Sequence, residues 1–280
     1  MNPSVLMSAL ALRGNQQAMD IISDNLANLQ TAGFKRREAA FGDLFLAYLR
    51  QPQALSREGR RTVDGLREGN GVRLAGTLAD WRVGGARETG RELDLYIDGD
   101  AFFAIEGAGG ETWYTRDGNF HLSPAEGGQW HLVTASGHRL LGTDGQPLVL
   151  PPFHRLIVDN QGRISAEQEN GVAATLDAAI ALVRFRSPDA LERVGRNSYR
   201  IADAYLAADP AEAVPLWEDV APEARTAGNS AIRQNYLESS NVDLATELTR
   251  LIQAQRAYQL NAQVLISADR MMGLANSLRS

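Results

Sequence analysis

Residues Leu244 to Met272 read LATELTRLIQAQRAYQLNAQVLISADRMM, and their spacing specifies the structure of this end of the chain. From Leu244 a track of positions steps alternately by four and three residues. The track comprises Leu244, Leu248, Leu251, Gln255, Tyr258, Ala262, Leu265, Asp269 and Met272. A mostly apolar heptad track of about four heptads is typical of a helix that packs along another helix. The sequence therefore predicts a long C-terminal helix with an apolar seam.

A second heptad track lies at the opposite end, and it predicts an N-terminal helix over about Asn2 to Leu29. Pro3 suits the first turn, where its missing N–H costs nothing, and Gly33 suits the left-handed position after the helix. The track runs through Val5, Ala9, Leu12, Gln16, Met19, Ser23 and Leu26. Two such helices would most simply pair within one chain. Periodicity alone leaves open whether their remaining apolar surface packs against other chains.

Between the helices, from about Leu66 to Tyr205, glycines and short alternating runs predominate. Leu93 to Ile97 alternates at its start, Asp98-Gly99 breaks the run, and Ala101 to Ile105 resumes as a buried strand. Further turn pairs follow at short intervals, where glycine, asparagine or aspartate favours positive φ. This pattern predicts an antiparallel all-β domain that folds by itself, rather than βαβ units.

The predicted fold class is therefore α+β, with long terminal helices that form a coiled-coil-like pair and a central antiparallel all-β domain. We divide the chain into five segments. They are 1–36, the N-terminal heptad helix; 37–75, an extended linker; 76–205, the β domain; 206–236, a second linker; and 237–280, the C-terminal heptad helix.

Composition excludes several classes of protein. The 280 residues include no cysteine, which rules out disulfides, thiolate metal sites and cysteine nucleophiles. Lys35 is the only lysine, so no Gly-Lys-Ser/Thr phosphate loop exists. A net charge of -6 argues against a nucleic-acid-coating protein. No apolar run approaches the roughly 18 residues of a membrane helix, and we expect neither membrane insertion nor a cleavable signal peptide.

Candidate chemistry is sparse. His121, His131, His138 and His154 match no zinc spacing, and no Gly-x-Ser-x-Gly elbow accompanies them. The cluster Phe34-Lys35-Arg36-Arg37 is interpreted as a solvated face or an ion-pair partner. We expect no catalytic residue, cofactor or metal. An enzyme site around His121 and His131, or an adhesin-like binding module, stays as an alternative class.

Three strings resemble signatures of the bacterial flagellar rod and hook axial family. Asn25 to Lys35 (NLANLQTAGFK) is similar to its N-terminal signature, and Tyr114 to Phe120 (YTRDGNF) to a hairpin of its β domain. Leu237 to Asp243 (LESSNVD), with Gln255 to Tyr258, resembles its C-terminal signature. Two positions depart from the family pattern, because Ala101 and Asn235 stand where the family commonly has glycine.

The resemblance implies a structural subunit that polymerises helically into the flagellar rod. The long segment after Phe41 to Phe45, leading into Gly69 to Val72, favours a distal rod subunit over a proximal rod or hook subunit. The implied partners are further copies of the chain, proximal rod subunits, hook or hook-adjacent subunits, the rings around the rod and the flagellar export apparatus. No nucleic-acid partner is implied. The implied location is the periplasmic rod of the basal body.

Heptad and signature positions together give the expected assembly interface. Its residues are Val5, Leu12, Met19, Asn25, Leu26, Asn28, Leu244, Leu248, Leu251, Tyr258, Ala262, Leu265 and Met272.

Overall fold

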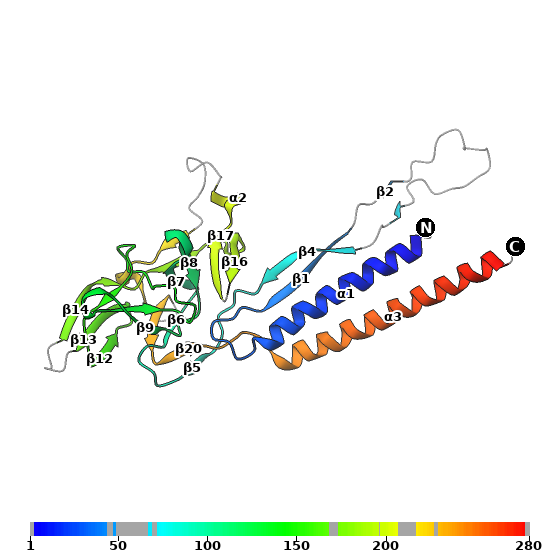
Figure 1. Cartoon of the computed structure of the whole chain (residues 1–280). Coiled ribbons are helices and arrows are strands. Elements are labelled where there is room, and N and C mark those ends of the chain that lie inside the picture. The colour runs from blue at the N-terminus through cyan, green and yellow to red at the C-terminus, as the bar shows by residue number, and fades with distance from the viewer. Residues whose placement is uncertain are drawn as a thin grey trace. The chain divides into compact units, whose positions relative to one another are not determined.

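The computed structural model describes residues 3–43, 47–48, 67–68, 72–167, 173–195, 197–206, 217–226 and 229–277 (Figure 1). The chain divides into two compact units. Unit 1 comprises Met1–Ala27, Arg37–Leu78 and Asp243–Ser280, and unit 2 comprises Asn28–Arg36 and Ala79–Val242. Helices gather in unit 1 and antiparallel strands in unit 2, so the predicted α+β class is confirmed.

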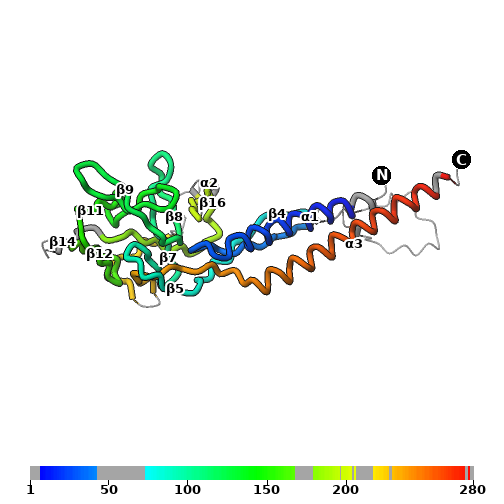
Figure 2. The backbone as a smooth tube through the Cα atoms, turned by 60° about the horizontal axis from the view of Figure 1, so that its bottom comes forward, coloured from blue at the N-terminus to red at the C-terminus, as the bar shows by residue number. Residues whose placement is uncertain are grey.

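Two long helices form most of unit 1. Helix α1 spans Pro3–Ala27 and α3 spans Leu244–Ser277, and they lie side by side in opposite directions (Figures 1 and 2). Asp243 caps α3, because its Oδ1 accepts hydrogen bonds from Thr246 N at 2.8 Å and Thr246 Oγ1 at 2.6 Å. Beyond α1, Gly33 has φ +65°, as its predicted left-handed role requires.

Short strands complete unit 1. Strand β1 (Arg37–Asp43) pairs with β4 (Val72–Ala79), and β2 (Ala47–Tyr48) pairs with β3 (Arg67–Glu68). Strand β1 also packs against α1. Since an isolated two-stranded ribbon is marginally stable, α1 supports this one. Most of the linker expected over 37–75 lies outside the described residues.

Antiparallel sheets make up unit 2. The largest has the strand order β16-β17-β8-β7-β15-β18, and two three-stranded sheets have the orders β11-β10-β9 and β12-β13-β14. Two ribbons pair β6 with β19 and β5 with β20. The short helix α2 spans Asp203–Leu206. The strands are β5 Ala86–Glu88, β6 Leu95–Asp98, β7 Ala101–Glu106, β8 Thr112–Thr115, β9 His121–Pro124, β10 Trp130–Val133, β11 Val149–Leu150, β12 Arg155–Val158, β13 Arg163–Glu167, β14 Ala173–Ala179, β15 Leu182–Phe185, β16 Leu191–Gly195, β17 Ser198–Ile201, β18 Trp217–Asp219, β19 Ala231–Gln234 and β20 Tyr236–Glu238.

The hydrophobic core of unit 2 forms on both faces of β7. Phe103 and Ile105 belong to one buried cluster, whereas Phe102 and Ala104 belong to another on the opposite face. This double burial explains why Ala101 to Ile105 reads as a continuous apolar run rather than an alternating one. Ala101 is fully buried in the strand. It is not among the described residues with positive φ, so alanine fits there without backbone strain.

The segment 206–236, expected as a linker, contributes strands to unit 2. Strand β18 forms an edge of the six-stranded sheet against β15, and β19 pairs with β6 over four residues. Between β19 and β20, Asn235 has φ +70°, the left-handed conformation expected of the residue that replaces glycine here. A fragment that ends at Tyr205 therefore lacks three strands of this unit.

Candidate assembly surface

Within the described residues, the fully buried positions of α1 and α3 carry small or polar side chains. On α1 the buried positions include Ser8, Gly14 and Asn25. On α3 they are Glu247, in the first turn, and Ala268. Small side chains allow two helices to approach closely, and the larger Leu251 and Leu265 of α3 are half-buried.

Ten large apolar side chains of α3 are exposed within the described part of the chain. They are Leu244, Leu248, Ile252, Tyr258, Leu260, Val264, Ile266, Met271, Met272 and Leu274. Leu244, Leu248 and Ile252 follow at intervals of four residues and so share one face, which we call the outer stripe. A helix with apolar residues on more than one face is normally covered on more than one side. The exposed residues thus mark a surface suited to another helix.

The residues expected to form the assembly interface divide by exposure. Leu244, Leu248, Tyr258 and Met272 are exposed, at 45%, 41%, 38% and 39%. Asn25 is buried. The side chain of Val5 lies outside the described part of the chain. The half-buried members are Leu12, Met19, Leu26, Asn28, Leu251, Ala262 and Leu265. A single heptad track did not reveal Ile252, Leu260 or Ile266, because it follows one line along the helix.

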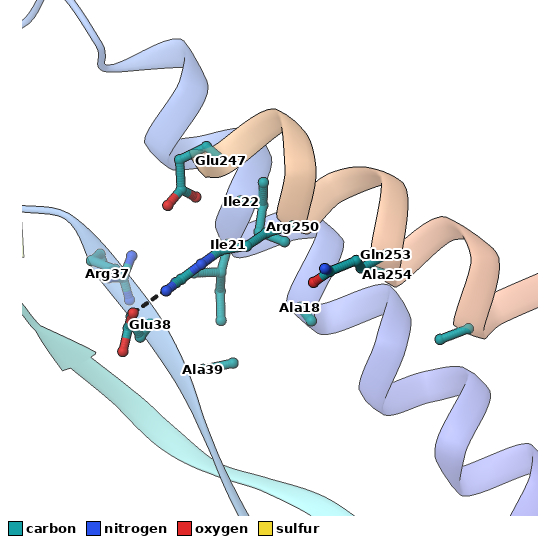
Figure 3. Close-up of a pocket in the computed structure, with 11 residues that line it drawn as sticks. Ala18, Ile21, Ile22, Arg37, Glu38, Ala39, Glu247, Arg250, Gln253 and Ala254 are labelled. Atoms are coloured by element: carbon teal, nitrogen blue, oxygen red, sulfur yellow. Dashed lines mark hydrogen bonds and ion pairs between the residues drawn. The ribbon is translucent and has the colours of Figure 1, made fainter. Parts of the chain in front are cut away.

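A groove of about 440 Å³ opens between α1, α3 and β1. Figure 3 shows side chains of all three elements around it, with Ile21 from α1, Arg37 and Glu38 from β1, and Glu247 and Arg250 from α3. Arg250 donates to Glu38 Oε1 at 2.6 Å, and both side chains are partly exposed. An exposed pair of this kind contributes at most about 1 kcal/mol.

In unit 2, all three family-like strings meet at one buried carboxylate. Glu238, on β20, accepts a hydrogen bond at Oε1 from Lys35 Nζ at 2.6 Å and another from Gly84 N at 2.7 Å. Its Oε2 accepts from Arg116 Nε at 2.8 Å. The side chains of Glu238, Lys35 and Arg116 are each at most 3% exposed. Of the two interpretations of its basic cluster, Lys35 therefore fits the ion-pair partner and not the solvated face.

Further hydrogen bonds of these two cations join the strings to the backbone. Lys35 Nζ also donates to Arg82 O at 2.8 Å. Arg116 donates to Gly99 O at 2.8 Å and to Ala101 O. Most hydrogen-bond donors and acceptors of the cluster thus have partners inside the protein. Buried charges are tolerated under this condition.

Two cations share one carboxylate, and this surplus of positive charge acts on both pKa values. Burial lowers the pKa of Lys35 most, Glu238 opposes this shift and Arg116 adds to it, and the resulting pKa is about 8. Burial alone would raise the pKa of Glu238, but Arg116 and Lys35 outweigh it, so this pKa lies below its usual value. Glu238 consequently stays ionised at neutral pH, whereas the charge of Lys35 responds to alkaline pH.

Close backbone approaches fix the same strings. A Cβ on Gly33 would lie 2.5 Å from Arg116 O, and one on Gly118 would lie 1.7 Å from Leu95 O. Real side chains do not reach such distances, so both positions require glycine. Nearby, Asn241 Oδ1 accepts from Arg36 N at 2.7 Å, and its Nδ2 donates to Asp80 O at 2.7 Å.

Two of the histidines contact backbone carbonyl oxygens. A ring nitrogen of His131 lies 3.0 Å from Leu148 O, and one of His138 lies 3.1 Å from Glu106 O. Among the described residues, no three His, Cys, Asp or Glu side chains are grouped to hold a metal ion. A hollow of about 450 Å³ in unit 2 is lined by Tyr114 and Asp219 but not by the histidines. None of the described helices is sufficiently long and apolar to span a membrane.

Family models match three parts of the chain in the order of the strings. Residues 4–35 match the flagella basal body rod protein model, 96–166 the D1 domain model of the flagellar hook protein FlgE/F/G, and 233–278 the C-terminal model of the flagellar basal body rod FlgEFG proteins. The class defined by the fold and these matches is that of flagellar rod and hook structural proteins, which are not enzymes.

Curated relatives align over nearly the whole length. The chain is 32% identical over 274 residues to the flagellar basal-body rod protein FlgG of Buchnera aphidicola subsp. Baizongia pistaciae, covering 97% of this chain and 98% of that protein. It is 31% identical to FlgG of Bacillus subtilis, covering 93% of each. It is 29% identical to the flagellar hook-basal body complex protein FlhP of the same organism, covering 99% of each. The chain belongs to the flagellar basal-body rod protein family and is a structural subunit of the flagellar rod.

Proposed function

We propose that this chain polymerises helically into the distal rod, which transmits torque towards the hook. The observation that carries the proposal is the exposure of large apolar side chains on α3, with the outer stripe Leu244, Leu248 and Ile252 as its clearest line. Soluble monomers rarely expose large contiguous apolar surfaces. A head-to-tail contact that does not close on itself generates a filament.

Within each subunit, α1 and α3 would pair as a coiled coil. The half-burial of Leu12, Met19 and Leu265 supports this pairing, because each lies on a heptad track and is only partly covered. Exposed Leu244, Leu248, Tyr258 and Met272 would contact neighbouring subunits. The expected interface thus serves two contacts, one inside the subunit and one between subunits.

The distal position in the rod is supported by the relatives named FlgG, which this chain matches along nearly its full length. Proximal rod subunits, hook or hook-adjacent subunits and the surrounding ring proteins would then be its neighbours. Delivery would be through the flagellar export apparatus, and the location would be the periplasmic rod. A proximal rod or hook subunit is the alternative within the family.

Electron microscopy of basal bodies from cells that lack this chain tests the proposal. A distal rod subunit predicts basal bodies with a short proximal rod and no hook, and restoration of both by the reintroduced chain. Basal bodies with a complete rod but no hook would assign the chain to the hook. Normal hooks and motility without the chain would refute the rod function.

A further inference from the structure

We propose that Asn25 and Glu247 form a polar clamp that fixes the register in which α1 and α3 pair. The clamp is a property of the helix pair in unit 1, and it does not depend on the proposed position in the rod. The clamp gives a role to two buried polar residues, which the packing of apolar side chains between two helices does not require.

The alanines that line the groove between the helices specify register weakly. Around the groove, Ala18 of α1 lies among Ala254 and Ala257 of α3. Small residues that recur every three or four positions offer nearly the same surface when one helix slides by a heptad. A polar contact at one position can therefore help to distinguish the observed alignment from a shifted one.

Asn25 is suited to this task because its amide is used completely. Its Oδ1 accepts from Arg37 N at 2.9 Å, and its Nδ2 donates to Arg37 O at 2.8 Å. The second Nδ2 hydrogen goes to Glu247 Oε2 at 3.1 Å. The first two bonds fix the side chain relative to the start of β1, and the third reaches across to α3.

Glu247 receives that bond from a position where a carboxylate is favoured. It lies in the first turn of α3, shortly after the Asp243 cap, where the helix dipole stabilises negative charge. Figure 3 shows its side chain projecting from this turn at one end of the groove. Both Asn25 and Glu247 are 1% exposed, so water cannot replace the bond between them.

A slide by one heptad in either direction would separate the clamp residues and oppose one of them to an alanine. In the observed alignment Asn25 meets Glu247, and Ala18 and Ala254 lie around the same groove. Moving α3 by seven residues would bring Ala254 towards Asn25, or Ala18 towards Glu247. The clamp residue that faces the alanine would then lack its hydrogen-bond partner in the helix contact, which is the costly case for buried polar groups. A single buried polar contact can specify helix register in this way.

Disulfide trapping in the full-length chain measures the register directly, because the chain contains no native cysteine. One variant carries Ala18→Cys with Ala254→Cys, which reports the observed register. A second variant carries Ala18→Cys with Asn261→Cys, which reports a slide of one heptad. The yields of the two intramolecular disulfides are compared after oxidation of dilute protein, and mass spectrometry identifies the linked peptides.

With the clamp intact, the first disulfide is expected to exceed the second by about tenfold or more, since each 1.4 kcal/mol is a factor of about ten. Asn25→Leu with Glu247→Leu should bring the ratio close to one while far-ultraviolet circular dichroism retains the helix signal. Glu247→Gln keeps an acceptor and should preserve the preference. As a matched control, Glu38→Leu with Arg250→Leu removes the neighbouring exposed ion pair and should also preserve it.

An unchanged ratio in the double leucine variant, with helix content retained, would overturn the proposal. Equal yields with the clamp intact would overturn it as well. If the double variant loses its helix signal, Glu247→Met alone supplies the ratio, because Asn25 then keeps both bonds to Arg37. An undiminished preference in that variant would likewise refute the clamp.

Discussion

Replacing Glu238 by glutamine removes the charge that balances two buried cations without changing the shape of the side chain. Glu238 accepts from Lys35 at 2.6 Å and from Arg116 at 2.8 Å, and all three side chains are almost completely buried. The variant leaves Lys35 and Arg116 close together with no anion between them. Because desolvated charges depend on their partners, this substitution is the most informative single change in unit 2.

The expected loss of stability follows from this burial. Removing one partner of a buried ion pair costs roughly 3–5 kcal/mol, whereas an exposed pair is worth at most about 1 kcal/mol. For a unit of this size, 1 kcal/mol corresponds to about 2–4 °C in melting temperature. We therefore expect Glu238→Gln to lower the melting temperature of unit 2 by about 6–20 °C.

The assay is thermal unfolding of the full chain followed by tryptophan fluorescence, which reports unit 2 because all four tryptophans, Trp81, Trp113, Trp130 and Trp217, belong to it. The matched control is Asp98→Asn, which removes the partner of Arg233 at 2.7 Å where the arginine is half exposed. Its expected shift is under about 4 °C. A double variant, Lys35→Met with Glu238→Gln, should recover part of the loss, because it leaves one uncompensated cation instead of two.

Equal melting temperatures for Glu238→Gln and the Asp98→Asn control would contradict this expectation. Such a result would mean that the buried triad contributes no more than an exposed pair. If the double variant instead loses the sum of the stabilities lost by Glu238→Gln and by Lys35→Met alone, the two effects are additive. Such additivity would exclude a charge interaction between Lys35 and Glu238.

Three further outcomes follow from the same geometry. Burial lowers the pKa of Lys35 in the folded state from 10.5 to about 8, so the unfolded chain binds more protons between these two pH values. The free energy of unfolding should therefore rise from about pH 8 to 10.5 relative to that of Lys35→Met. Parallel plots of unfolding free energy against pH for the two proteins would contradict the shift. Gly118→Ala should abolish the native fold of unit 2, because the added Cβ would lie 1.7 Å from Leu95 O. Gly85→Ala, which has open space around it, should change the melting temperature little. Equal melting temperatures for the two variants would contradict the close approach at Gly118. Asn235 has φ +70°, so Asn235→Gly should leave the free energy of unfolding nearly unchanged, and Asn235→Val should lower it by more than about 1 kcal/mol. Equal midpoints of urea unfolding for the two variants would contradict the left-handed conformation.

Local patterns in the sequence predicted the helices and the strands well. The heptad tracks predicted helices over about Asn2 to Leu29 and from Leu244, and the structure has α1 over Pro3–Ala27 and α3 over Leu244–Ser277. The buried run Ala101 to Ile105 became β7. These predictions succeeded because periodicity and turn chemistry depend on neighbouring residues.

Long-range pairing could not be predicted in the same way. Lys35 and Glu238 are 203 residues apart, and Arg116 and Glu238 are 122 apart. Nothing in the spacing of these charges indicates that they meet. The same holds for β18 and β19, whose short segments lie between prolines and alanines and gain their strand conformation from β15 and β6.

The exposure of the α3 side chains could be predicted only in part for the same reason. The heptad track of α3 identified Leu248 and Leu265, which the structure places in exposed and half-buried positions respectively. It could not identify Ile252, because residues on a second face follow another line along the helix. It also passed over Glu247, whose burial depends on a hydrogen bond from Asn25 across the helix pair.

Rod formation by outer-stripe variants shows whether α3 carries the assembly surface. Leu248→Asp and Ile252→Asp change side chains that are 41% and 51% exposed, so both should leave the subunit folded. Thr249→Asp, on an exposed neighbouring position of α3, is the matched control. Electron microscopy of basal bodies should show no distal rod in the two stripe variants and normal rods in the control, with unchanged circular dichroism of all three purified chains. Normal rods in both stripe variants would contradict an assembly surface on α3.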